Sequence, residues 1–186
     1  MSSPDETTVG VDGGPTVDVA NRSEVPDVDV ERWARVAVET LVVEQVDGGR
    51  LDLTFIDADE MAELNRIHMG HDGPTDVLSF PLDVDDGGAD GDGFPMGLDG
   101  DDGDVPPVLL GDVVICPRVA IDQAPEHCGD PDTELTLLVV HGVLHILGHD
   151  HAEPVEEAVM VERESVHLQR YGLTHPGPVR AESDRS

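Results

Sequence analysis

Four histidines stand close together between His141 and His151, at the end of an apolar segment that begins near Leu135. His141 and His145 are four residues apart, so on a helix they project from the same face, one turn apart. Gly148 can end that helix, because glycine tolerates the left-handed backbone conformation that terminates helices. The chain can then turn and bring His151 back to the same point. Three imidazoles that leave one coordination position open are typical of a catalytic zinc site.

The residue after the first histidine determines which chemistry such a site supports. The spacing matches the zinc-protease motif H-E-x-x-H-x-x-G-x-x-H, in which the glutamate is the general base. Here that position is Gly142, which cannot move a proton. Asp150 and His149 lie beside the predicted ligands. We expect Asp150 to orient a ligand histidine or the loop backbone, and His149 either to do the same or to transfer protons. The pattern predicts a zinc scaffold without peptidase machinery.

Composition limits the classes of partner. The 186 residues are enough for one domain with a core. They include 41 acidic and 10 basic residues, all of the latter arginine, for a formal charge of -31. Membrane surfaces and duplex DNA both require positive charge, so neither is expected as a partner. The acidity suits concentrated salt, where the Debye length is about 3 Å at 1 M; a genomic base-composition bias would equally remove lysine.

The chain carries no sign of export or membrane insertion. Residues 1–14 are acidic and polar, unlike a signal peptide. No stretch approaches the roughly 20 apolar residues needed to span a bilayer. Cys116 and Cys128 are too few and too isolated for a disulfide framework. We therefore expect a cytoplasmic protein with two free thiols.

Hydrophobic periodicity predicts helices and short strands in alternation, hence one α+β domain. Trp33 is expected to anchor the core, and Asp57 and Glu60 to form a capping box. The strands are expected over 16–20, 50–56, 75–81 (at a sheet edge) and 108–116 (central and buried), and the helices over 27–46, 57–67, 117–124, from 130 through the histidines, and 154–171.

Composition also sets the expected boundaries. Residues 1–15 are predicted to be a disordered acidic tail, 16–173 the folded domain and 174–186 a loose C-terminal tail. Within the domain, 83–104 is mostly Asp and Gly and is expected to be a flexible acidic insert. It lacks the D-x-[DN]-x-[DN]-G-x5-E spacing of a calcium loop.

Three blocks in this order resemble the YbeY family: the Gly-Pro-Thr-Asp-Val-Leu-Ser-Phe-Pro run at 73–81, Leu-Gly-Asp-Val-Val-Ile at 110–115, and the histidine run. The resemblance implies a small mixed β-sheet flanked by helices. It implies a zinc-dependent endoribonuclease that cuts single-stranded RNA in rRNA processing, including maturation of the 16S rRNA 3′ end, and in ribosome quality control. It places one zinc ion per chain on His141, His145 and His151.

One position departs from the family. Members often carry an arginine, thought to assist catalysis, where this chain has Met69. Arg66 and Arg118 are hypothetical substitutes, and His68 and His71 are weaker ones. Together with the metal ligand His141 and with His149, the two arginines form the predicted catalytic set.

The small number of basic residues limits which RNA partners are expected, and other positions bear on the alternative functions. A chain of charge -31 meets repulsion from RNA, which favours single strands over duplexes and recruitment by the ribosome or a ribosomal protein. A zinc peptidase is disfavoured by Gly142. The more serious alternative is a non-catalytic, zinc-containing ribosome assembly factor, which the Met69 departure favours.

Overall fold

A computed structural model describes residues 5–82, 108–149 and 154–177. Its elements follow the predicted order, with one additional strand at the start. They are β1 (Asp5–Gly10), β2 (Thr16–Asn21), α1 (Val30–Val43), β3 (Arg50–Phe55), α2 (Ala58–His68), β4 (Val77–Pro81), β5 (Leu109–Ile115), α3 (Pro117–Gln123), the 3-10 turn η1 (Ala124–Glu126), α4 (Pro131–Ile146) and α5 (Pro154–Arg170).

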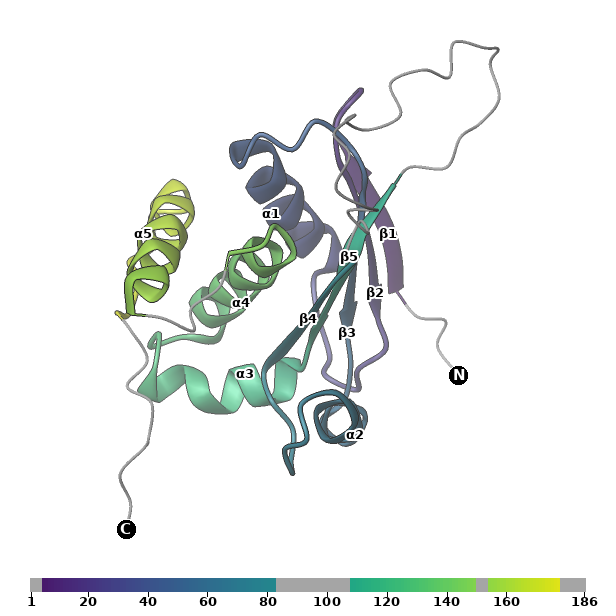
Figure 1. Cartoon of the computed structure of the whole chain (residues 1–186). Helices are drawn as coiled ribbons and strands as arrows, with labels where there is room; N and C mark the ends of the chain where they lie inside the picture. The colour runs from purple at the N-terminus through teal and green to yellow at the C-terminus, as the bar shows by residue number, and fades with distance from the viewer. Residues whose placement is uncertain (1–4, 83–107, 150–153, 178–186) are drawn as a thin grey trace, which may run out of the picture.

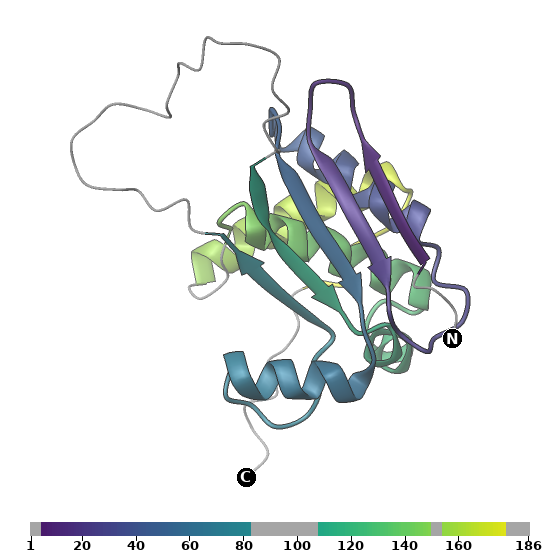
Figure 2. The same cartoon turned by 90° about the vertical axis from the view of Figure 1, so that its right-hand side faces the viewer.

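The strands form one mixed sheet in the order β1-β2-β3-β5-β4, seen face-on in Figure 2. β2, β3 and β5 run parallel, and β1 and β4 pair antiparallel at the two edges. β5 lies inside the sheet, between β3 and β4, and buries Val113, Val114 and Ile115 on its two faces, although the middle strand is β3. β4 ends in Pro81 at an edge, where a missing N–H costs no ladder bond. The α+β class and the small mixed sheet flanked by helices are therefore confirmed.

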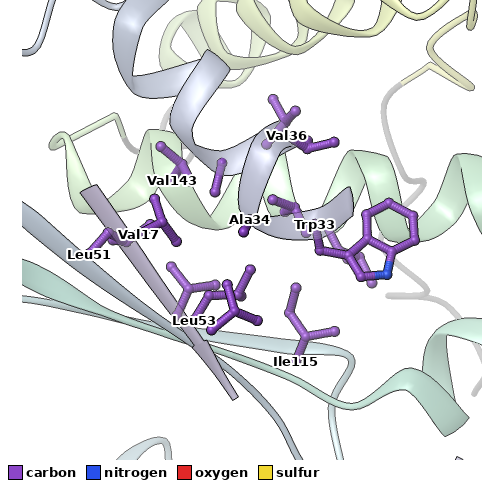
Figure 3. Close-up of a cluster of buried hydrophobic side chains, with 14 of the residues drawn as sticks. Val17, Trp33, Ala34, Val36, Leu51, Leu53, Ile115 and Val143 are labelled. Atoms are coloured by element: carbon purple, nitrogen blue, oxygen red, sulfur yellow. The ribbon is translucent and has the colours of Figure 1, made fainter. Parts of the chain in front are cut away.

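Helices α1 and α4 cover one face of the sheet, and α5 lies outside them (Figure 1). Their core includes Val17, Leu53, Ile115 and Val143, all fully or almost fully buried, and Trp33, which is 2% exposed (Figure 3). Burying a side chain of this size stabilises the fold by about 1.5–3 kcal/mol. α2 packs on the opposite face, through a smaller cluster around Met61.

Two expectations for the first part of the chain were wrong. Residues 5–10 are not a disordered tail: they form β1, paired along its length with β2. Its side chains alternate between more and less exposed positions, and Val9 packs against the core. This alternation is a sequence signal for a strand, but it is short and the residues around Val9 are polar. Asp57 does not form a capping box, because its carboxylate accepts a hydrogen bond from the Glu24 N–H (2.8 Å) in the preceding loop.

Some expectations lie outside the described residues, namely the acidic insert at 83–104 and the C-terminal tail beyond 177. The start of that tail, 174–177, is described and includes His175, which bonds to α5. Within the described ranges, no helix has the length and apolarity to cross a membrane.

Candidate metal and catalytic site

Helix α4 is fixed at both ends by local signals. Asp130 caps its start by accepting a hydrogen bond from the Thr133 N–H (3.0 Å), and Pro131 occupies the first turn. At its end Gly148 adopts φ +86°, and the His149 N–H donates to the Leu144 carbonyl (3.1 Å). Together with the bond from the Gly148 N–H to the His145 carbonyl (3.0 Å), this forms a Schellman motif. The predicted start and the predicted glycine stop are both confirmed.

His141 and His145 meet on one side of this helix. Their Nε2 atoms lie 3.0 Å apart and their ring centroids 4.5 Å apart. Nitrogens bound to one tetrahedral zinc at about 2.0–2.1 Å are about 3.3–3.4 Å apart, so the two imidazoles fit such an ion after a small separation. His151 and Asp150 lie outside the described residues. The third ligand therefore remains a prediction.

Glu164 of α5, which is only 4% exposed, anchors the first of these histidines. Its Oε1 lies 2.6 Å from His141 Nδ1, and its Oε2 lies 2.7 Å from His175 Nε2. Burial raises the pKa of this carboxyl, but the hydrogen bonds and charges of the two histidines outweigh burial and lower its pKa to about 2. An ionised Glu164 accepts the Nδ1 proton of His141, which leaves Nε2 facing His145.

Sequence reasoning missed Glu164 and His175. Helix α5 carries four glutamates, and Glu164 is the only one of them that is buried. The available signal was position: Met160, Glu164 and Leu168 recur every four residues, and all three are buried. A carboxylate on an apolar stripe needs a partner, and here the partners are histidines.

A cavity of about 450 Å³ opens beside this site. His141, Glu164 and His175 line it together with Asp76 and Val77, which lie just before and at the start of β4. The start of β4 thus forms part of the cavity wall. Ser79, farther along β4, donates a hydrogen bond to the Gly142 carbonyl (3.3 Å), which joins β4 to α4.

Gly142 lies where α4 packs directly on the sheet. A Cβ atom there would lie 2.5 Å from Cγ1 of Val113 on β5. A glutamate in the position of the protease base would therefore collide with the sheet. The peptidase alternative is disfavoured by packing as well as by chemistry.

We predict that Gly142→Ala lowers the free energy of unfolding by up to about 2 kcal/mol. Overpacking costs about 1–3 kcal/mol and exceeds the roughly 1 kcal/mol that alanine contributes within a helix. Urea unfolding measures the change. Gly48→Ala is the control, since a Cβ there meets nothing within 4 Å. A Gly142→Ala protein more stable than the native chain would contradict the close packing.

The two predicted catalytic arginines lie away from the described lining of this cavity. Arg66 on α2 is exposed and pairs with Glu63 (2.7 Å), and Arg118 on α3 is exposed and pairs with Asp122 (3.0 Å). Met69 caps the C-terminus of α2 and is 49% exposed. The structure does not bring these side chains to His141.

The loop after α4 is tied to the end of α1. His149 Nε2 lies 3.8 Å from Glu44, whose carboxylate also contacts Arg163 (2.5 Å) and His167 (2.9 Å). Glu44 is almost buried, so these partners satisfy a carboxylate removed from water. The arrangement favours positioning over proton transfer for His149.

A second group of side chains that could bind a metal lies near the start of α4. His127, Cys128 and Glu134 place ligand atoms within 4.8 Å of one another. No motif in the sequence indicates this group, because Cys128 stands alone in its segment.

Comparison with known proteins identifies the family. The sequence matches the family described as Endoribonuclease YbeY over residues 17–172. The chain belongs to the YbeY family. A YbeY endoribonuclease from Salinispora tropica is 45% identical over 151 residues, 78% of this chain and 88% of the relative. Another, from Saccharopolyspora erythraea, is 36% identical over 173 residues, 92% of this chain and 88% of that protein. The YbeY resemblance drawn from the three sequence blocks is confirmed.

A solved structure supports the fold of this YbeY chain. The solution structure of TM1509 from Thermotoga maritima aligns with a TM-score of 0.50 at 23% identity, over 90% of this chain and 99% of that protein. At this identity the likeness concerns the fold alone.

Proposed function

We propose that this chain is a metal-dependent endoribonuclease that acts on single-stranded RNA in rRNA processing, with one zinc ion held by His141, His145 and His151. The observation that carries the proposal is the pair of imidazoles 3.0 Å apart, anchored by buried Glu164, in a chain of the YbeY endoribonuclease family. Maturation of the 16S rRNA 3′ end, ribosome quality control and a cytoplasmic location belong to the same proposal.

The residues of the site have different roles. Glu164 accepts a hydrogen bond from His141 Nδ1, which turns the lone pair of Nε2 toward His145 and toward a shared ion. Neutral imidazoles leave the charge of a bound cation undiminished. Bound zinc supplies a Lewis acid that polarises a phosphoryl oxygen and lowers the pKa of water toward about 7. Val77 of β4 lines the same cavity as His141 and limits how an RNA strand can enter it.

The negative charge that develops on the phosphate needs a second cationic partner. Arg66 and Arg118 are held only by exposed ion pairs, which contribute little and can break at little cost. Either arginine can therefore turn toward RNA. Arg66 is the stronger candidate because it lies one helical turn before Met69, the position of the family's arginine.

We expect Arg66→Ala to lower the rate of RNA cleavage by about 10²-fold, as when a single stabilising donor is removed. Arg118→Ala should have a smaller effect. Arg35→Ala is the matched control, because Arg35 is also an exposed helical arginine, paired with Glu31. The rate is measured on single-stranded rRNA under single-turnover conditions. Equal rates for the Arg66 and Arg35 variants would remove Arg66 from the catalytic set.

The charge of -31 supports the proposal that the ribosome presents the RNA. We expect RNA within a ribosomal particle to be cleaved faster than the same RNA free in solution, and the difference to shrink as salt screens the repulsion. Cleavage assays of both substrates at several salt concentrations measure this. Equal rates at low salt would contradict recruitment by the ribosome.

The alternative is a non-catalytic, zinc-containing ribosome assembly factor, which Met69 favours. The variant Met69→Arg separates the two. If the native chain is inactive and the variant cleaves RNA, the assembly factor is the better account. An active native chain excludes it.

A further inference from the structure

We infer that His127, Cys128 and Glu134 form a second divalent-metal site, of the zinc class, distinct from the histidine site. Glu134 and His141 are seven residues apart on α4, which is about 10 Å along the helix axis. Two metals that share one reaction lie about 3.5–4 Å apart. The second site would therefore clamp the turn before α4 and would not join in the RNA chemistry.

The distances fit one small ion. His127 Nδ1 lies 2.9 Å from Glu134 Oε2 and 3.7 Å from Cys128 Sγ. Tetrahedral zinc with bonds of about 2.1 Å to nitrogen and 2.3 Å to sulfur separates those two atoms by about 3.6 Å. Nitrogen, thiolate and carboxylate ligands suit zinc or cobalt better than magnesium or calcium. His127 and Glu134 also line the 450 Å³ cavity, so a metal ion bound by them has room for a water molecule as its fourth ligand.

Neighbouring side chains hold Glu134 in a fixed orientation. Gln123 donates one amide hydrogen bond to Glu134 Oε1 (2.9 Å) and another to Asp76 Oδ2 (2.7 Å). The first bond orients the carboxylate, whose two oxygens both face His127 Nδ1, Oε1 at 3.0 Å and Oε2 at 2.9 Å. Metal-binding carboxylates need this kind of outer support. Asp76 adds negative charge nearby.

Burial of the Glu134 carboxylate favours binding of a cation beside it. Glu134 is 0% exposed, and a carboxylate so far from water needs a cation beside it. That cation is either a protonated His127 or a metal ion. Burial, followed by the hydrogen bond and charge of Glu134, raises the pKa of the Cys128 thiol. Metal binding would displace the thiol proton, so affinity should increase with pH.

The test is titration of the reduced, metal-free, full-length chain with Co²⁺. We expect a thiolate-to-cobalt charge-transfer band that persists in the His141→Ala/His145→Ala variant and in Cys116→Ser. The band should disappear in Cys128→Ser and weaken at least tenfold in apparent affinity in Glu134→Gln. In the native chain, Zn²⁺ should also slow the reaction of Cys128 with a thiol reagent, which needs no substitution at the site.

Three results would overturn the inference. They are the absence of a band at millimolar Co²⁺, a band that depends on Cys116, or a band lost with the two α4 histidines. The first would leave His127 and Glu134 as a buried ion pair. None of them bears on RNA cleavage, so this site and the proposed function fail separately.

Discussion

Replacing both His141 and His145 with alanine is expected to abolish zinc binding at the histidine site and to lower RNA cleavage by at least about 10³-fold. The two Nε2 atoms face each other at 3.0 Å, and they are the described ligands of the proposed ion. Without them, a bound cation no longer stabilises charge at the phosphate, and one such loss costs about 10²–10³ in rate. Elemental mass spectrometry and single-turnover cleavage of single-stranded rRNA measure the two effects.

The matched control is Glu31→Ala/Arg35→Ala, which also removes two polar side chains four residues apart on a helix, both of them exposed. It should retain the metal and at least half of the native rate. Circular dichroism should show folded protein for both double variants, because the α4 histidines are only partly buried and the buried Glu164 keeps His175 as a partner (2.7 Å). Native cleavage by the His141→Ala/His145→Ala protein would place the active site elsewhere.

Glu164→Gln is the second change with a large expected effect. The amide keeps the shape of the side chain, but its NH₂ group now faces one of two histidines, His141 or His175, which are 2.6 and 2.7 Å from the native carboxylate. Loss of such an anchor typically costs 10–100-fold in metal affinity or activity. It also leaves a buried polar mismatch worth about 1–3 kcal/mol of unfolding free energy. Competition with a zinc chelator and urea unfolding measure both.

Two comparisons separate positioning from general destabilisation. Glu162→Gln, an exposed glutamate on the same helix, should change neither quantity. Glu164→Asp keeps the charge and should recover part of the zinc affinity. Native zinc affinity in Glu164→Gln would show that His141 needs no carboxylate to orient it.

The parts of the site that the sequence predicted are those set by local signals. The spacing of His141 and His145, the cap at Asp130 and the stop at Gly148 all act within one or two helical turns. A helix therefore brings the two imidazoles together whatever surrounds it. The three family blocks added the remainder of the fold and the endoribonuclease assignment, and both are confirmed.

The parts that the sequence did not predict depend on packing between distant segments. Glu164 reaches His141 across 23 residues, and only the docking of α5 on α4 distinguishes it from its exposed neighbours. The sequence indicates an isolated thiol at Cys128, because the neighbouring carboxylate of Glu134 comes from the next helix. β1 is stabilised by its pairing with β2 more than by its own composition.

The most direct measurement of the central claim is cleavage of single-stranded rRNA by the metal-free chain as zinc is added back. We predict no cleavage without metal and a rate that rises to a plateau at about one equivalent of zinc in the Cys128→Ser background, where only the histidine site remains. Cleavage by the metal-free protein at the native rate would contradict a zinc-dependent active site on α4.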